Sequence, residues 1–177
     1  MLAPIEAFDF TRNGANYTAR VYVDDSQDHP WDNEDGHGPV RYVNLRHGTK
    51  HSGAKRPGER VLHQDGATFW FYDWQAACKL ARADGWNAEP YDAPGRIERA
   101  VLADFRRLGA YLREEWSYVG VSVTPEGEPE AYAHALWGIE SDAEDYIREA
   151  ADEIADEVHA EAIAARLAAL PDPACCI

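Results

Sequence analysis

The segment that most constrains the fold runs from residue 141 to residue 170, where apolar residues repeat at the spacing of an amphipathic helix. It opens with Ser141-x-x-Glu144, the pattern of a capping box, in which each side chain satisfies a free backbone N–H at the helix start. The sequence therefore predicts a long closing helix. Its apolar side chains share one face: Ile147, Ala150, Ala151, Ile154, Val158, Ala162 and Ala165.

The opposite face of this predicted helix is acidic. From Glu140 to Glu161, ten acidic residues stand against one base, Arg148, a net charge of −9 in a chain whose total is −15. The nine acids from Asp142 to Glu161 lie along about 28 Å of helix axis, or roughly one carboxylate per 3 to 4 Å. This spacing is close to the ~3.4 Å charge spacing along one DNA strand.

Composition limits the class of protein. At 177 residues the chain can bury a substantial core, and 45% hydrophobic content with six Trp, nine Tyr and five Phe indicates a folded globule. The acidic balance disfavours binding to nucleic acid or an anionic membrane, and favours a cationic partner surface. No apolar run approaches the ~18 residues of a membrane span, no signal peptide is evident, and the three cysteines form no disulfide framework. We expect a cytoplasmic protein.

Alternating apolar residues predict strands in hairpins, and apolar residues at helical spacing predict two further helices. This order predicts an α+β fold, an antiparallel sheet built from hairpins with three helices packed on one face. We expect residues 1–177 to form a single domain, with a long irregular region over 26–60 and a flexible tail over 171–177. The strands are expected over residues 5–10, 16–24, 67–72, 118–124 and 131–136, with 40–43 as a candidate short strand. The helices are expected over 73–85 and 97–115.

The irregular region combines opposite charges with most of the histidines. Residues 24–36 contain six acids and residues 41–60 carry a net charge of +5, so we expect the two loops to pair internally. Convergent imidazoles and carboxylates can bind a metal, but no established ligand spacing is present. We expect no bound metal, while a metal-dependent enzyme built on residues 29–63 stays open as an alternative. The histidines of this region are His29, His37, His47, His51 and His63.

The sequence offers no complete catalytic motif. Ser122 and Ser52 lack the context of a nucleophile elbow, and Cys78 falls on the apolar face of its helix. Neither a Walker loop nor a dinucleotide fingerprint is present. Stacking on nucleic-acid bases needs aromatic side chains among basic ones, and the basic segment over 41–60 has only Tyr42. We therefore predict no catalytic residue, no cofactor and no direct binding of nucleic acid.

The acidic face of the closing helix has two interpretations. Most charged helix faces are only solvated, and such faces usually alternate acids with bases. Here like charges at i,i+4 repel, and each pair lowers the stability of the helix by a few tenths of a kcal/mol. Arg148 is the one base in this stretch that can offset the repulsion. A destabilising run of like charges along one helix face is typical of a surface that binds a cationic groove. Surface charge of this kind speeds encounter and makes the affinity fall with salt.

Five short stretches carry a family resemblance: Arg60-Val-Leu62, Phe71-Tyr-Asp73-Trp-Gln-Ala-Ala77, Asp84-Gly-Trp86, Trp116-Ser-Tyr118-Val-Gly120-Val and Leu136-Trp137-Gly-Ile-Glu140-Ser141. Together they resemble a group of small acidic proteins of unknown function encoded by tailed bacteriophages and prophages, over most of residues 40–160. The group supplies no functional residues. The resemblance implies a phage accessory role, and such proteins include anti-restriction and anti-CRISPR inhibitors, some of which mimic DNA through an acid-rich surface.

These observations favour a non-catalytic accessory protein of phage type in the host cytoplasm. Its acidic helix face is expected to bind a basic host protein that itself binds nucleic acid, and so to inhibit a defence system by mimicking DNA. A structural or assembly protein is a further alternative. The predicted partner-binding residues are Asp142, Asp145, Glu149, Asp152, Glu153, Asp156 and Glu157.

Overall fold

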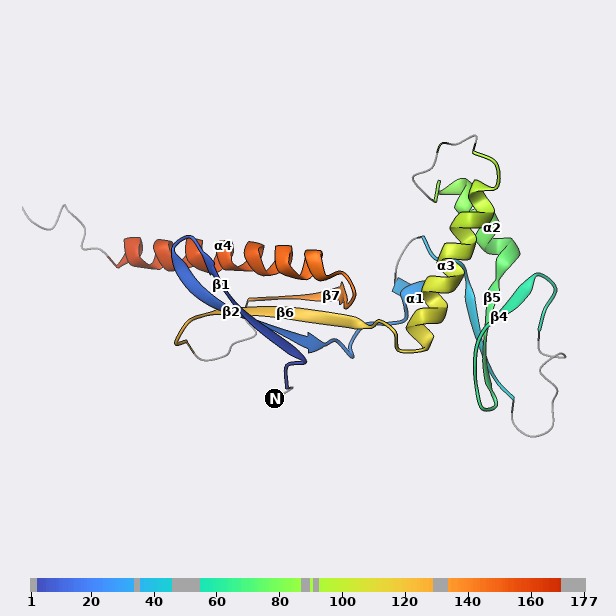
Figure 1. The fold of residues 1–177 in the computed structure, drawn as a ribbon, viewed down its shortest axis with the longest axis horizontal. Helices are drawn as coiled ribbons and strands as arrows, with labels where there is room; N and C mark the ends of the chain where they lie inside the picture. Colours follow the sequence, from blue (N-terminus) through green and yellow to red (C-terminus); the bar gives the residue numbers. More distant parts are fainter. Residues whose placement is uncertain are drawn as a thin grey trace, which may run out of the picture. The chain divides into compact units, whose positions relative to one another are not determined.

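The chain is an α+β protein with two antiparallel sheets and four helices in the described residues, which confirms the predicted fold class. It divides into two compact units: unit 1 comprises residues 1–26 and 117–177, and unit 2 comprises residues 27–116 (Figure 1). The single domain predicted over residues 1–177 stays a prediction. The structure is a computed structural model that describes residues 3–33, 36–45, 55–86, 90, 93–128 and 134–169.

Unit 1 contains a four-stranded antiparallel sheet in the order β1-β2-β6-β7. The first hairpin is confirmed, because Asn13 and Gly14 both have positive φ, as a tight two-residue hairpin turn requires. The last strand begins later than the predicted 131–136, and residues 129–133 lie outside the described residues. The strands are β1 (Glu6–Arg12), β2 (Ala15–Val23), β6 (Tyr118–Pro125) and β7 (Ala135–Glu140).

One helix, α4 (Glu144–Ala168), packs along this sheet (Figure 1). Its buried residues recur at helical spacing, as predicted, and meet the side chains that β2 and β6 direct to the same face of the sheet. This contact forms the core of unit 1. The buried residues of α4 are Ile147, Ala150, Ala151, Ile154, Ala155 and Val158, and those of β2 and β6 are Tyr17, Ala19, Val21, Val119, Val121 and Val123.

Two predictions about this helix are wrong. The capping box does not form, because α4 begins after Ala143 and the Ser141 hydroxyl instead accepts a hydrogen bond from the Ser117 backbone N–H at 3.0 Å. Ala162 and Ala165 are exposed, as are all described residues from 160 to 169. The last turns of α4 extend beyond the β1–β2 turn (Figure 1), so the sheet offers them no surface to pack against.

Unit 2 contains a three-stranded antiparallel sheet in the order β3-β5-β4, on which two helices pack. Asp73 caps α2 as predicted, since its Oδ1 accepts a hydrogen bond from the Ala76 backbone N–H at 2.9 Å. The core joins Leu62 and Tyr72 of the sheet to Ala77, Val101 and Leu108 of the helices. The elements are α1 (Pro30–Asn33), β3 (Val40–Asn44), β4 (Glu59–Asp65), β5 (Thr68–Asp73), α2 (Trp74–Ala83) and α3 (Arg96–Leu112).

The predicted single sheet is replaced by two, and the helices are divided between them. Alternation identifies a strand and not its partner: β2 pairs with β6, while the strands of unit 2 pair among themselves. The candidate short strand over 40–43 is confirmed as β3, and the region predicted to be irregular over 26–60 also contains α1 and the start of β4. Both β3 and β4 pair with β5. Residues 46–54 and the tail over 171–177 lie outside the described residues.

Among the described residues, no helix combines the length and the apolar composition that crossing a membrane requires.

Candidate functional site: an acidic helix face

Six of the seven predicted acidic residues lie on α4, and none of the six is buried. Asp145, Glu149, Glu153 and Glu157 are exposed, whereas Asp152 and Asp156 are partly covered. Asp142 is exposed too, but it precedes the helix. The structure thus brings six of the seven predicted residues onto one helix, outside the set of residues that Ile154 and its neighbours bury.

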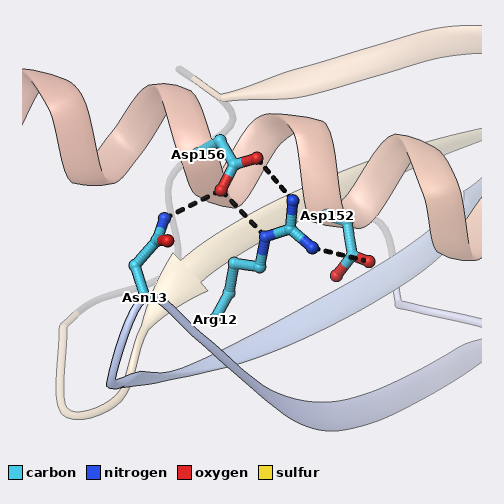
Figure 2. Close-up of polar contacts among 4 residues, drawn as sticks. All are labelled: Arg12, Asn13, Asp152 and Asp156. Carbon is cyan, nitrogen blue, oxygen red and sulfur yellow. Dashed lines mark hydrogen bonds and ion pairs between the residues drawn. The ribbon is translucent and has the colours of Figure 1, made fainter.

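A cation from the first hairpin reaches two of these carboxylates (Figure 2). The Arg12 guanidinium, at the end of β1, donates to both oxygens of Asp156, with Nε at 2.9 Å from Oδ1 and Nη2 at 2.7 Å from Oδ2. Its Nη1 lies 3.4 Å from Asp152 Oδ2, and the Asn13 side-chain amide donates to Asp156 Oδ1 at 2.8 Å. We call these four residues, Arg12, Asn13, Asp152 and Asp156, the Arg12 clasp.

The Arg12 clasp changes the electrostatics of the face. The hydrogen bonds from Arg12 and Asn13 lower the pKa of Asp156 to about 2, and the same contact raises the pKa of Arg12. Both groups therefore stay ionised at neutral pH and compensate each other. Two of the predicted binding carboxylates thus hold α4 against the β1–β2 turn, and they add less outward charge than the sequence suggested.

Four carboxylates remain on the outer face. Asp145, Glu149, Glu153 and Glu157 follow one another at i,i+4 and form what we call the acidic row, with steps of about 6 Å along the axis. Among the described residues, none supplies an ion pair to any member of this row. Arg148, the one base in this stretch of the helix, lies 4.9 Å from the centre of the Phe8 ring on β1.

Charge is divided very unevenly between the two units. Unit 1 contains 18 acidic and four basic residues, a net charge of −14, whereas unit 2 contains 14 acidic and 13 basic residues, a net charge of −1. In unit 2, Arg41 of the basic segment pairs with Glu59 of the same segment at 2.7 and 2.8 Å, and Arg60 stacks on Trp74. Nearly all of the imbalance of the chain therefore belongs to the unit that carries the acidic row.

The three described histidines of the alternative metal site each contact a different partner. His29 stacks on Trp31, with ring centres 4.6 Å apart, His63 contacts Trp70, and His37 binds Asp104. His47 and His51 lie outside the described residues. Within the described part of the chain, no three potential ligands converge on one point where a metal ion could bind.

Sequence reasoning missed Asp104 of α3. Its side chain is 6% exposed and accepts hydrogen bonds from Tyr72, Gly38 and His37. A signal was present: Asp104 follows Val101 by three residues and precedes Leu108 by four, so it occupies the apolar face of its helix. Arg12 carried no such signal, because its partner on α4 is 144 residues away in the sequence.

Comparison of the chain with protein-family models, with curated proteins and with solved structures finds no match.

Proposed function

We propose that this chain is a non-catalytic accessory protein of phage type, which presents the acidic face of α4 to a basic, nucleic-acid-binding site on a host protein. In the host cytoplasm it competes with DNA for that site and so inhibits a defence enzyme. The observation that carries the proposal is the acidic row: four exposed carboxylates in succession without a compensating base, in a unit of net charge −14.

The acidic row costs stability in the isolated protein. Three successive i,i+4 pairs of like charge each destabilise the helix by about 0.2 to 0.5 kcal/mol. A cationic groove removes this repulsion when it binds, and the mutual attraction of the two surfaces accelerates their encounter. A solvated face with no partner gains nothing from keeping its charges of one sign.

The Arg12 clasp supports the proposal in a different way. Because Asp152 and Asp156 are tied to the β1–β2 turn, α4 is anchored on the hairpin as well as on the core. A surface that is already ordered loses less conformational entropy when it binds. We therefore assign direct contact with the partner to Asp142 and the acidic row, and orientation of the face to Asp152 and Asp156.

The experiment is a competition for DNA. A labelled duplex is bound to a purified restriction nuclease or CRISPR effector, and displacement by the protein is followed by fluorescence anisotropy. The variant Glu149→Gln/Glu153→Gln/Glu157→Gln is compared with the control Asp28→Asn/Asp65→Asn/Asp84→Asn, which removes the same charge from exposed positions of unit 2. Both variants have a net charge of −12, against −15 for the natural chain.

We expect the α4 variant to need about tenfold more protein for half-displacement, because the local charge that complements the groove is lost. The unit 2 control should displace DNA as the natural chain does, and the affinity of the natural chain should fall with salt. Equal effects of the two variants would show that net charge alone acts, and failure of the natural chain to displace DNA would remove the proposal.

A further inference from the structure

A second polar site lies in unit 2, around the carboxylate of Asp104 on α3. Its Oδ2 accepts hydrogen bonds from the Tyr72 hydroxyl at 2.6 Å and from the Gly38 backbone N–H at 2.8 Å. Its Oδ1 lies 2.6 Å from Nδ1 of His37. Burial and the neighbouring Asp104 raise the pKa of Tyr72, so its hydroxyl keeps its proton and acts as a donor.

This arrangement fixes the orientation and the tautomer of His37. An ionised carboxylate can only accept hydrogen bonds, so Nδ1 of His37 carries a proton. Nδ1 is thus the ring nitrogen bound to Asp104, and a ring that carries a proton on both nitrogens is a cation paired with that carboxylate. Asp104 is in turn held by Tyr72 and Gly38, so the imidazole is anchored to both the sheet and α3.

His37 and Asp104 line an open hollow of about 530 Å³ whose walls are mostly apolar. Ala100 and Ala103 of α3 contribute small side chains, and Trp86 contributes a flat aromatic one. Arg107, one turn beyond Ala103, supplies a cation whose guanidinium stacks on the Trp116 ring, 3.9 Å from its centre. The Nε1–H of Trp86 is buried and has no acceptor among the described residues. The size of this hollow is typical of a site for a small molecule.

We propose that this hollow binds a small aromatic anion, a carboxylate or phosphate carried on a flat ring. The ring lies against Trp86 and the two alanines, which leave room for it. The anionic group takes charge-assisted hydrogen bonds from protonated His37 and from Arg107. Asp104 is a positioning residue, since it acts on the ligand through His37. This site does not depend on the acidic face of α4.

The binding test uses the full chain and three probes: benzoate, phenyl phosphate and benzyl alcohol. Amide and indole N–H chemical shifts are followed by NMR as each probe is added. We expect saturable shifts at Gly38, Trp86 and Ala103 with an anionic probe, and binding about tenfold weaker with benzyl alcohol, which lacks the charge. Tighter binding of benzoate or of phenyl phosphate identifies the anionic group. Absence of saturable shifts with both anions would overturn the proposal.

Two variants separate binding from a purely structural role of Asp104. Ala103→Leu fills the hollow from an exposed helical position and leaves the hydrogen bonds of Asp104 in place, while Ala164→Leu makes the same change on the exposed end of α4. His37→Gln removes the cation. We expect Ala103→Leu to weaken binding of all three probes at least about tenfold with an unchanged unfolding midpoint, because it occupies the volume of the ring.

The control Ala164→Leu should bind like the natural chain. His37→Gln should weaken binding of the anions about tenfold and leave benzyl alcohol unaffected, because only the charged contact is lost. A purely structural network around Asp104 predicts the opposite pattern, in which Ala103→Leu binds as the natural chain does, or His37→Gln weakens all three probes equally. Either result would contradict the proposal.

Discussion

Unit 1 and unit 2 each pack helices on an antiparallel sheet, but they place their carboxylates differently. Unit 1 has a net charge of −14, and the acidic row of α4 faces water. Unit 2 has a net charge of −1 and buries two carboxylates, Asp104 under three donors and Glu59 beside Arg41. Water and salt screen exposed charges far more than buried ones. Removal of an acid from the exposed row of α4 should therefore affect binding, whereas removal of the buried Asp104 should affect stability.

The largest effect is expected for Asp104→Ala. This change leaves the Tyr72 hydroxyl, the Gly38 N–H and the His37 ring without their common acceptor in a buried place. We expect unit 2 to lose about 3 to 5 kcal/mol of unfolding free energy, as is usual when one partner of a buried polar network is removed. Asp84→Ala, at an exposed position of the same unit, is the control and should change it by less than about 0.5 kcal/mol.

Urea unfolding in a Trp137→Phe background measures this change. Trp137 is the one tryptophan of unit 1 in the sequence, so the five that remain report on unit 2. If Asp104→Ala unfolds at the same urea concentration as its parent, Asp104 does not organise unit 2, and the contrast between the units disappears.

The second prediction compares two isoleucines of the same helix. Ile154 is 7% exposed and packs in the core, whereas Ile163 is 44% exposed on the turns of α4 that extend past the sheet. Ile154→Ala should cost unit 1 about 2 to 4 kcal/mol through lost burial and a cavity. Ile163→Ala should cost less than about 0.5 kcal/mol. Hydrogen exchange of the amides of α4 measures both, and equal losses would mean that the end of the helix is also packed.

This pair of residues shows how far the sequence predicts the fold. Helical spacing identified Ile154 as buried, and the hairpin at Asn13-Gly14 followed from local turn chemistry. The same spacing placed Ala162 and Ala165 on the buried face, because periodicity along a helix does not reveal where the sheet beneath it ends. Strand pairing is equally non-local, so one sheet was expected where two form.

The candidate site was predictable to a similar extent. The acidic residues and their common face follow from composition and from the 3.6-residue period of a helix. The Arg12 clasp does not, since nothing local links a hairpin turn to a helix more than a hundred residues later. Asp104 could have been found, because a carboxylate among apolar helix positions needs donors when it is buried.

The third prediction separates stability from binding within unit 1. Glu153→Lys places a base between Glu149 and Glu157, and it changes two repulsive i,i+4 pairs into attractive ones. We expect it to stabilise unit 1 by about 1 kcal/mol at low salt and by less at high salt. The same change should weaken competition with DNA, because it interrupts the acidic row. Thermal unfolding and the anisotropy assay measure the two effects, and a variant that competes better would contradict the proposed surface.

The smallest effect is expected at the Arg12 clasp, and it appears in a titration. The pKa of Asp156 is lowered to about 2, below the ordinary value of about 3.9 for aspartate. A lowered pKa means that the pairing stabilises the folded state above about pH 4, and that this contribution is lost as the pH falls through about 2. Arg12→Gln should therefore raise the pKa of Asp156, with Asn13 still holding it somewhat below the ordinary value.

Carbon-13 NMR of the side-chain carboxylates measures this shift, and Arg113→Gln is the matched control. Arg113 pairs with Glu115 in unit 2 and lowers its pKa, so that variant should move Glu115 and leave Asp156 unchanged. Competition with DNA should weaken only slightly in Arg12→Gln, because the acidic row itself is intact and only its anchor to the β1–β2 turn is lost. A large loss of competition with no change in the Asp156 titration would mean that Arg12 itself contacts the partner, and the division between orienting and contacting residues would then be wrong.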